Sequence, residues 1–317
     1  MAIDADRRLL LVHAHPDDES ILTGATMARY AAEGVHVTLI TCTRGELGEV
    51  IPVELAHLAH DRDDTLGEHR VGELAAAMAA LGVGDHRFLD EVVTGDEVVT
   101  GEGSGPTFPR AHYRDSGMVW GPDGQATAAP GTGPAAFALA DVHDAAARLA
   151  VVLREVRPHV VITYEPGGGY GHPDHVQAHR VTMRAVAMAA GSGAGGSPWS
   201  VPKVYWIVIP ERAARAALTA IAESGENPFE GVVPDAPLPS MFIPDELVTT
   251  VIDGSGQVGA KIAALRAHAS QITVDHPFFA LSNGVGQPLM SQEFYRLVRG
   301  VAAGPLDGDG RETDLFG

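Results

Sequence analysis

The sequence lacks cysteine pairs, long apolar runs and an excess of cations. Its one cysteine, Cys42, cannot form an internal disulfide bond, which favours a reducing compartment and a buried structural role for this residue. The apolar run at 9–12 is short, and acidic residues precede it where a signal peptide carries positive charge. No stretch is long enough to span a bilayer. We therefore expect a cytoplasmic protein.

The charge of the chain excludes a second group of partners. Its 317 residues include 22 Lys and Arg against 41 Asp and Glu, a formal net charge of −19 at pH 7. Such a chain repels nucleic-acid phosphates and anionic membrane surfaces, so we expect neither as a partner. Apolar residues make up 45% of the chain, which is enough for a globular protein with a sizeable core.

Strand-like and helix-like segments alternate through the first part of the chain. Short apolar or β-branched runs predict strands at 8–14, 35–43, 86–90 and 159–165. Helical spacing, often ended by glycine or proline, predicts helices at 20–34, 68–82, 137–158 and 173–190. This alternation is typical of parallel strands joined by crossover helices. The sequence predicts an α/β protein with a Rossmann-like, doubly wound, mostly parallel sheet.

The pattern changes after a stretch rich in Gly and Ser at 191–199. Strands are predicted at 203–209 and 246–253, and helices at 211–225 and 256–272. We expect a Rossmann-like, metal-binding catalytic domain at 1–190. A smaller C-terminal α/β region at 191–317 would complete the substrate cleft. Alternatively, this region would belong to the same globular domain as residues 1–190. The loops at 44–67 and 91–136 are long for simple connections, which indicates function or mobility.

Two polar clusters follow predicted strands. They are HAHPDDES at 13–20 and YEPGGGYGHPDHVQAH at 164–179, and both contain His-Pro-Asp. The carboxyl ends of parallel strands meet on one rim of the sheet, where doubly wound proteins bind their ligands. Glycines in the second cluster let the backbone turn sharply and approach a ligand closely. We therefore expect both clusters to form one site.

Several of these residues are candidate metal ligands. His15 and Asp18 lie three residues apart around the stiff Pro16, so both side chains can turn to one point. A third ligand would be His172 or His175, and His175 lies about one turn into the following helix. Two histidines, a carboxylate and open positions are typical of a catalytic zinc site. The same ligands also suit iron(II).

The remaining polar groups suit metal-assisted hydrolysis. Asp17, next to Asp18, is placed to take the proton of the attacking water. His172 is a candidate acid for the leaving group, and Tyr170 could donate a hydrogen bond to a developing oxyanion. Asp174 could orient His172 or a ligand histidine.

Other interpretations compete with a metal-dependent hydrolase. His-Pro-Asp-Asp is ordinary loop composition, and we expect His13 to pack at the end of its strand. A binding protein on the same scaffold would lack a base or an acid, yet Asp17 and His172 are both present. A nucleotide-dependent oxidoreductase would need glycines and backbone N–H groups in the first strand-to-helix turn, where this chain has carboxylates. The paired clusters favour the hydrolase.

The two clusters resemble the zinc-dependent de-N-acetylases of the N-acetylglucosaminyl-phosphatidylinositol de-N-acetylase (LmbE-like) superfamily, and its actinobacterial mycothiol branch in particular. The similarity extends nearly from end to end. Supporting stretches are 43–50 (TRGELGEV), 69–83, 114–118 (RDSGM), 153–175, 265–272 (LRAHASQI), 280–283 (ALSN) and 312–317 (ETDLFG). The 91–136 loop departs from the pattern except at RDSGM.

The resemblance implies a catalytic set that agrees with the chemistry of the residues themselves. The set is His15, Asp18 and His175 for zinc, Asp17 as general base, and His172 and Tyr170 for the oxyanion and the leaving amine. On the substrate side it implies hydrogen bonds to sugar and inositol hydroxyls from Glu49, Arg70 and Asp115. Each of these three could instead be a surface ion-pair residue.

Two activities within the branch compete, both on small sugar–inositol molecules. One removes acetate from N-acetylglucosaminyl-inositol in mycothiol biosynthesis, and the other cleaves an amide of mycothiol S-conjugates. Gly171 and the ALSN stretch are similar to the deacetylase pattern. The S-conjugate amidase pattern has a proline at the position of Gly171 and a lysine near Leu22, and this chain has neither. We therefore expect the deacetylase activity.

Overall fold

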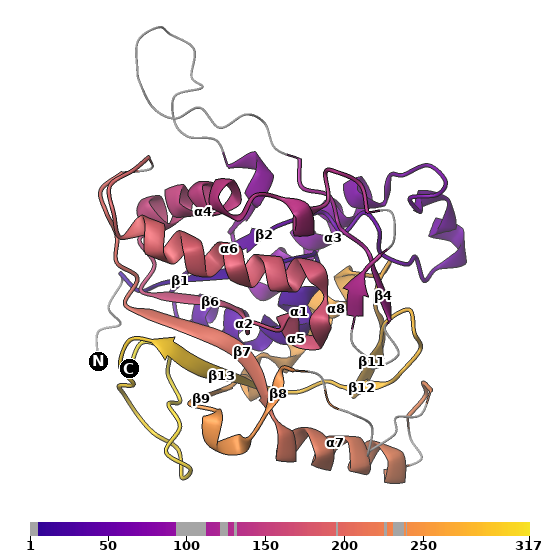
Figure 1. Ribbon diagram of the computed structural model, residues 1–317. Coiled ribbons are helices and arrows are strands. Elements are labelled where there is room, and N and C mark those ends of the chain that lie inside the picture. The colour runs from indigo at the N-terminus through magenta and orange to yellow at the C-terminus, as the bar shows by residue number, and fades with distance from the viewer. Residues whose placement is uncertain are drawn as a thin grey trace, which may run out of the picture.

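The computed structural model describes residues 6–92, 112–120, 126–129, 132–194, 196–224, 227–230, 238 and 240–317. Its centre is a sheet of eight strands in the order β3-β2-β1-β6-β7-β13-β9, with β8 paired to β7 beside this path (Figure 1). The strands from β3 to β7 in this order run parallel, and β13 is antiparallel to both of its neighbours. The predicted α/β architecture with a mostly parallel sheet is confirmed.

The strands and helices have the following bounds. The sheet contains β1 (Arg8–His13), β2 (His36–Thr41), β3 (Asp85–Phe88), β6 (Val160–Tyr164), β7 (Lys203–Pro210), β8 (Phe242–Ile243), β9 (Thr250–Asp253) and β13 (Gln292–Arg299). Two small sheets contain β4 (Met118–Trp120) with β5 (Ala126–Ala128), and β10 (Thr273–Asp275), β11 (Phe278–Ala280) and β12 (Gln287–Pro288). The helices are α1 (Asp18–Leu22), α2 (Gly24–Ala32), α3 (Leu66–Leu81), α4 (Val142–Val156), α5 (Gly168–Gly171), α6 (Pro173–Ala189), α7 (Glu211–Ser224) and α8 (Val258–Ala267). Short 3-10 turns are η1 (Val53–Leu58), η2 (Leu89–Glu91), η3 (Phe137–Leu139), η4 (Asp245–Leu247) and η5 (Ser255–Gln257).

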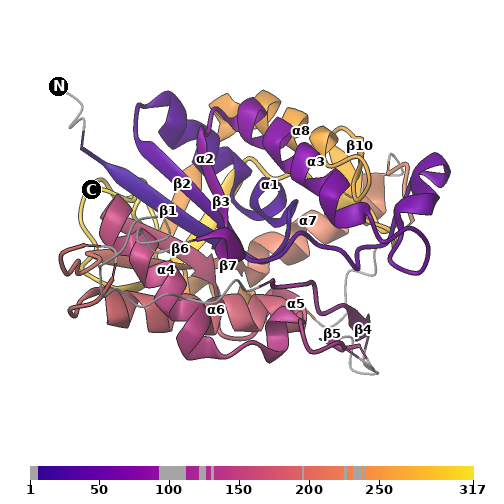
Figure 2. The same cartoon turned by 90° about the horizontal axis from the view of Figure 1, so that it is seen from above.

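Helices cover both faces of the sheet. Figure 2 shows α2, α3 and α8 on one side and α4 and α6 on the other. Leu9 and Leu11 of β1 pack into the core on the first side, and Leu10 and Val12 pack into the core on the second. All four side chains are fully buried, which explains why β1 reads as a continuous apolar run.

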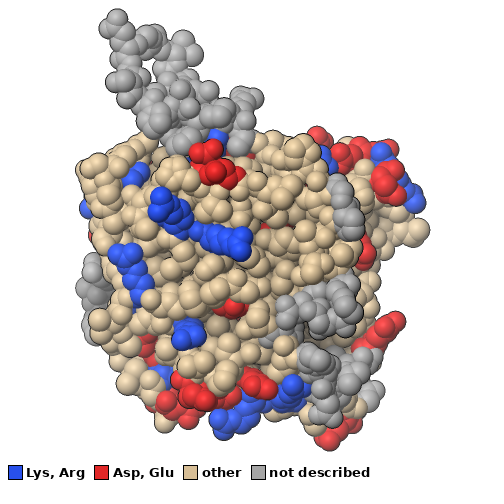
Figure 3. Space-filling view, viewed as in Figure 1, with Lys and Arg blue, Asp and Glu red and all other residues tan. Residues whose placement is uncertain are grey.

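The viewed surface in Figure 3 is sparsely charged over α4 and α6, where a few Lys and Arg side chains lie. Acidic side chains gather mainly along the margins of this face. Among the described residues, no helix has the length and apolar content needed to cross a membrane.

The chain reverses its direction of travel across the sheet at β1. It proceeds to β2 and β3 on one side, and to β6, β7 and the later strands on the other. Such a reversal opens a crevice at the carboxyl ends of the two central strands. β1 and β6 are hydrogen-bonded neighbours from Leu9↔Val160 to Leu11↔Ile162, so the segments after them begin side by side.

Helix boundaries differ from the predicted ones at three places. The helix predicted at 20–34 is two helices, α1 and α2, with the junction at Thr23. The helix predicted at 137–158 begins at Val142, because the Asp141 carboxylate accepts the N–H groups of His143 and Asp144 and caps it there. The helix predicted at 256–272 ends at Ala267. The predicted loop at 91–136 lies partly outside the described residues.

The sequence prediction missed β13, which extends the main sheet between β7 and β9. Residues on both sides of the predicted boundary at 190–191 therefore contribute to one sheet. The division into a catalytic domain and a C-terminal region remains a prediction, and β10–β12 form a separate small sheet within the second part.

Candidate active site and metal centre

Both His-Pro-Asp clusters lie where a central strand gives way to a helix. The first follows β1 and leads into α1, which begins at Asp18. The second follows β6 and leads into α6, where the His172 side chain accepts the N–H of Asp174 as the N-cap. Pro173 occupies the first helical position, where proline fits because its missing N–H would have had no partner in the helix. The expected meeting of the two clusters on one rim is therefore observed.

Asp18 lies between two histidines. Its Oδ2 atom is 3.3 Å from His15 Nδ1 and 3.3 Å from His175 Nε2. The same oxygen accepts the hydroxyl of Tyr164 at 2.8 Å and the backbone N–H of His15 at 3.0 Å. Burial raises the pKa of Asp18, but the two histidines outweigh it and hold the pKa well below its usual value. Asp18 is therefore an ionised carboxylate.

The outward-facing nitrogens of both histidines already have partners. His15 Nε2 is 3.2 Å from Asp174 Oδ2, and His175 Nδ1 is 3.2 Å from the carbonyl of Gly168. His15 Nδ1 and His175 Nε2 are left facing Asp18, and His175 Nε2 is buried without a hydrogen-bond partner among the described residues. Ligand histidines in metal sites are typically held in this way through their second nitrogen.

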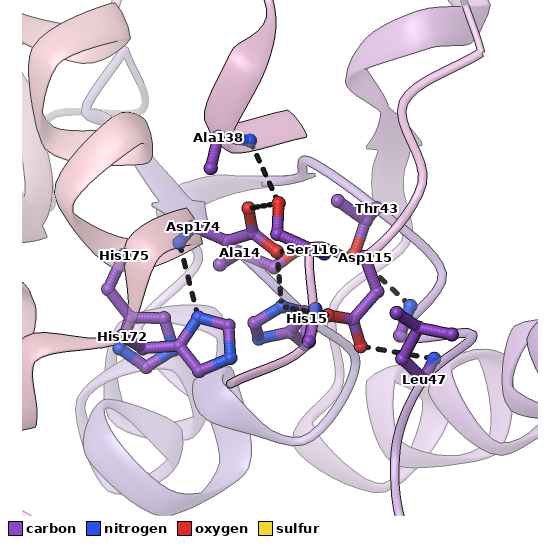
Figure 4. Close-up of polar contacts among 12 residues, drawn as sticks. Ala14, His15, Thr43, Leu47, Asp115, Ser116, Ala138, His172, Asp174 and His175 are labelled. Atoms are coloured by element: carbon purple, nitrogen blue, oxygen red, sulfur yellow. Dashed lines mark hydrogen bonds and ion pairs between the residues drawn. The ribbon is translucent and has the colours of Figure 1, made fainter. Parts of the chain in front are cut away.

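This arrangement fits a metal ion. Ligand atoms about 2.0–2.1 Å from a tetrahedral zinc ion lie about 3.3–3.4 Å from one another. Both distances from Asp18 Oδ2 have that length. Ligand atoms of His15, His172 and His175 also lie within 4.8 Å of one another, as do those of a second group formed by His15, Asp115, His172 and Asp174. Figure 4 shows the three imidazole rings gathered beside Asp174 and Asp115.

Asp174 ties the metal cluster to the segment before α4. Its Oδ2 accepts the backbone N–H of Ser116 at 2.8 Å, and its Oδ1 accepts the Ser116 hydroxyl. Ser116 Oγ in turn accepts the N–H of Ala138 at 2.9 Å (Figure 4). The Asp174 side chain thus contacts His15, whereas its backbone N–H contacts His172. Ser116 lies in the RDSGM stretch, but the sequence alone did not predict a role for it.

Asp17 lies beside the cluster and is partly exposed. Its φ of 120° and ψ of −36° place it in a conformation that residues other than glycine rarely adopt. Arg70 Nη2 donates to Asp17 Oδ2 at 2.9 Å and also to the carbonyl of Pro16. Burial raises the pKa of Asp17 to about 6, against the lowering effect of the Arg70 charge. A carboxylate with this pKa is well matched to general-base catalysis near neutral pH.

His172 and Tyr170 complete the wall of the cluster. The rings of His172 and His175 are stacked 4.9 Å apart, and the Tyr170 ring is 5.1 Å from that of His175. Burial and the neighbouring His15 and His175 lower the pKa of His172 well below its usual value, so its ring is neutral. Because Nδ1 accepts the Asp174 N–H, the ring proton is on Nε2. Burial raises the pKa of Tyr170, which keeps its hydroxyl protonated.

The three predicted substrate contacts lie in different environments. Asp115 is buried 3.7 Å from His15 Nε2, and its carboxylate accepts the N–H groups of Leu47 and Gly117. Arg70 is buried, and its guanidinium contacts Asp17 and two backbone carbonyls. Glu49 is exposed in the loop after β2. Their roles toward a substrate remain predictions.

His13 and Tyr164 support the cluster from behind. His13 is fully buried, with Nε2 2.9 Å from Thr23 Oγ1 and Nδ1 3.3 Å from the Tyr164 hydroxyl. Burial lowers the pKa of His13 to about 4, so it is a neutral packing residue, as expected. Sequence reasoning missed Tyr164, which ends β6 and stacks on His175 with ring centres 4.2 Å apart. Its position as the last residue of β6 and the first of the second cluster was the available signal.

The fold and this cluster define a Rossmann-like protein with a His/Asp cluster able to hold a metal ion at the carboxyl edge of the sheet. The family described as PIG-L, GlcNAc-PI de-N-acetylase, matches residues 10–186. The chain belongs to this family. The match covers both clusters, and the family prediction made from them is confirmed.

Relatives with high identity cover nearly the whole chain. A protein of Kineococcus radiotolerans, named 1D-myo-inositol 2-acetamido-2-deoxy-alpha-D-glucopyranoside deacetylase, is 59% identical over 99% of this chain and 83% of its own length. Proteins of the same name from Kribbella flavida and Streptomyces griseus are 53% and 54% identical over 98% of this chain, and 97% and 88% of their own lengths.

Solved structures show the same fold at low identity. A 4-carboxy-2-hydroxymuconate hydratase from Pseudomonas putida superimposes with a TM-score of 0.54, at 17% identity over 95% of this chain and 100% of that one. An N,N'-diacetylchitobiose deacetylase from Pyrococcus horikoshii has a TM-score of 0.50, at 17% identity over 83% of this chain and 70% of that one. A hydratase and a deacetylase thus share the scaffold, so the scaffold alone does not fix the reaction.

Proposed function

We propose that this protein is a zinc-dependent deacetylase. Its substrate would be 1D-myo-inositol 2-acetamido-2-deoxy-alpha-D-glucopyranoside, the N-acetylglucosaminyl-inositol of mycothiol biosynthesis, and its products the free amine and acetate. The observation that carries the proposal is the buried set His15, Asp18 and His175, with Asp17 beside it. Relatives above 50% identity that bear this substrate in their names support the choice of substrate. We place the enzyme in the cytoplasm.

The metal would be held by His15 Nδ1, Asp18 Oδ2 and His175 Nε2. Both nitrogens lie 3.3 Å from Asp18 Oδ2, and the second nitrogen of each histidine has another partner. His172 also lies near His15 and His175, with ligand atoms within 4.8 Å of theirs, but its Nδ1 is occupied by the N–H of Asp174 and its Nε2 carries a proton. A zinc ion bound there would polarise the acetamide carbonyl and activate a water molecule, and iron(II) could serve in the same ligand set.

Asp17, His172 and Tyr170 divide the proton transfers between them. Asp17 takes a proton from the attacking water, for which its place directly before the proposed ligand Asp18 suits it. His172 Nε2–H and the Tyr170 hydroxyl donate hydrogen bonds where negative charge develops on the acetamide oxygen. The proton taken by Asp17 is then available for the leaving amine. Asp174 fixes both His15 and His172 during these steps.

The sugar and inositol hydroxyls would be recognised on the side of Asp115, Arg70 and Glu49. Asp115 lies beside the metal set and already contacts the loop after β2 through Leu47. Glu49, in the same loop, is exposed and available to a hydroxyl. Arg70 would act on the substrate side mainly by holding Asp17 and the Gly45 carbonyl in place.

The alternative is cleavage of mycothiol S-conjugates. The corresponding pattern carries proline where this chain has Gly171. Gly171 has a φ of 93°, and proline is restricted to a φ near −65°. The backbone of the second cluster therefore favours the deacetylase.

The test is a comparison of two substrates on the zinc-loaded protein. N-acetylglucosaminyl-inositol and a mycothiol S-conjugate are supplied separately, and release of primary amine is measured with and without a chelator. We expect chelator-sensitive release with a kcat/KM at least about tenfold higher for N-acetylglucosaminyl-inositol, the effect of about 1.4 kcal/mol of extra transition-state binding. A preference for the conjugate would assign the amidase activity, and no release from either would refute the proposal.

A further inference from the structure

The backbone of Asp17 is held by a side chain outside the metal and substrate sets. Glu19 Oε2 accepts the N–H of Asp17 at 2.9 Å. The carbonyl of Asp17 accepts the N–H groups of Ser20 and Ile21, both at 3.0 Å. Together with Arg70 on the carboxylate, these contacts fix a residue whose φ of 120° is unfavourable for a side chain.

Glu19 is itself fixed from the far end of the sequence. Its Oε1 is 2.7 Å from His268 Nε2, a contact between residues 249 positions apart, and also accepts the Ser20 hydroxyl. Both Glu19 and His268 are fully buried. His268 is the C-cap residue that follows α8, and its carbonyl accepts the N–H groups of Gln271 and Ile272, so its ring projects from an anchored turn.

Glu19 and His268 depend on each other to hold the backbone of Asp17. A buried carboxylate without a partner is costly, so His268 sets the orientation of Glu19. Without the Glu19 oxygen, the N–H of Asp17 would be unsatisfied and the strained peptide could relax, carrying the Asp17 side chain with it. A displacement of about 1 Å at a reacting group can lower turnover about 100-fold.

We propose that Glu19 and His268 form a buried positioning pair that holds Asp17 in its catalytic conformation. The inference rests on the proposed function, in which Asp17 is the base. Among the described residues, the Glu19 carboxylate contacts the Asp17 N–H, the Ser20 hydroxyl and the His268 ring, so both members of the pair act through Asp17. A purely structural pair would instead tie α1 to α8 without affecting catalysis.

Two amide variants at residue 268 separate these roles. His268→Gln places an amide N–H near the position of imidazole Nε2, whereas the shorter side chain of His268→Asn does not reach Glu19. We expect His268→Asn to lower kcat about 10- to 100-fold, the size usual for partners that orient catalytic groups. KM and zinc content should stay within about twofold of wild type, because the metal ligands are unchanged. His268→Gln should recover most of the lost kcat.

Lys261→Met provides the matched control. Lys261 lies on α8 and forms a buried ion pair with Glu293 at 2.7 Å. The Glu293 carboxylate accepts N–H groups at the start of α2, so this pair supports α2 and not Asp17. We expect a lower thermal midpoint with kcat unchanged. If His268→Asn instead lowers the midpoint and leaves kcat at the wild-type value, the pair is structural and the inference is wrong.

A double variant tests whether the pair acts through the base. In an Asp17→Asn background, His268→Asn should cause no further loss, because contributions that act through one group are not additive. A further loss by the full factor would overturn the inference. A zinc-loaded wild type that releases no amine overturns the proposed function and this inference together, whereas an active wild type with unaffected His268 variants overturns the inference alone.

Discussion

The two His-Pro-Asp clusters enter their helices in different registers. In the first, Asp17 is the N-cap of α1, and the proposed ligand Asp18 is the first helical residue. In the second, His172 is the N-cap of α6, and the proposed ligand His175 is the third helical residue. The N-cap position therefore holds the proposed base in one cluster and the proposed hydrogen-bond donor in the other. The same His-Pro-Asp tripeptide supplies complementary groups because its position relative to the N-cap differs by two residues between the clusters.

The two clusters are also held by different means. The unusual backbone at Asp17 is maintained by the remote side chain of Arg70 and by the neighbouring Glu19, which His268 holds from 249 positions away. The second cluster takes its positive φ values at glycines, among them Gly168 at 70°. The first geometry depends on tertiary contacts, and the second depends on the absence of side chains. The geometry of the first cluster should therefore be lost when a remote side chain is removed. The geometry of the second should be lost when a methyl group is added to a glycine.

The largest effect is expected from removing a metal ligand of the second cluster. In His175→Ala, the protein loses the nitrogen that faces Asp18, and activity should fall to that of the chelated wild type. Zinc content, measured after dialysis, should fall in parallel. Retention of one zinc ion per chain with near wild-type activity would show that His175 is not a ligand.

Next in size is the loss of the base from the first cluster. Asp17→Asn should keep zinc but lower kcat about 1,000-fold, within the range of general-base catalysis. The control is Asp85→Asn, which disrupts another Arg–Asp pair, that with Arg87 at the start of β3. It should leave kcat unchanged. A kcat for Asp17→Asn close to that of wild type would remove Asp17 from the mechanism.

A methyl group added to the second cluster should have an intermediate effect. In Gly168→Ala, the new Cβ would lie 2.7 Å from the backbone nitrogen of Val176 and 3.0 Å from His175 Cβ, at a φ of 70°. We expect zinc affinity to fall about 10- to 100-fold, because the Gly168 carbonyl also holds His175 Nδ1.

Gly72→Ala is the control for this substitution. Gly72 lies on an exposed position of α3 with nothing within 4 Å of a new Cβ. Alanine there should raise the free energy of unfolding by up to about 1 kcal/mol and leave zinc affinity unchanged. Equal zinc affinities for the two variants, measured by competition with a chelator, would contradict the view that glycine sets the second cluster.

The elements that sequence could predict are those whose pattern is local. β1, β2 and β6 are apolar runs buried on both faces, and α3 ends at Gly82 in the left-handed conformation that favours glycine. β13 was missed because its polar and apolar residues are mixed, and its extended state follows from pairing with β7 and β9.

The candidate site likewise contains residues that local sequence predicts and residues that only distant contacts reveal. The predicted metal ligands and proton-transfer residues lie within two short motifs, and the adjacent strands bring those motifs together. Ser116 and His268 were missed, because each acts by contact with a residue 58 or 249 positions away. Both lie in stretches that resemble the family, RDSGM and LRAHASQI, but a stretch of sequence does not reveal which side chain it will meet.

The smallest expected effect is a shift in pH dependence, which tests the charge of Arg70 separately from its hold on the position of Asp17. Asp17 must be ionised to act as a base, so kcat/KM should fall as pH drops through its pKa, about 6 in the absence of metal and lower beside a bound cation. The Arg70 charge lowers this pKa, so Arg70→Met should move the acidic limb to higher pH by about one unit. Arg87→Met removes a guanidinium paired with Asp85 and Glu155 and is the control. It should not change the pH at which kcat/KM falls. An acidic limb that does not move in Arg70→Met would mean that Arg70 does not control the ionisation of Asp17.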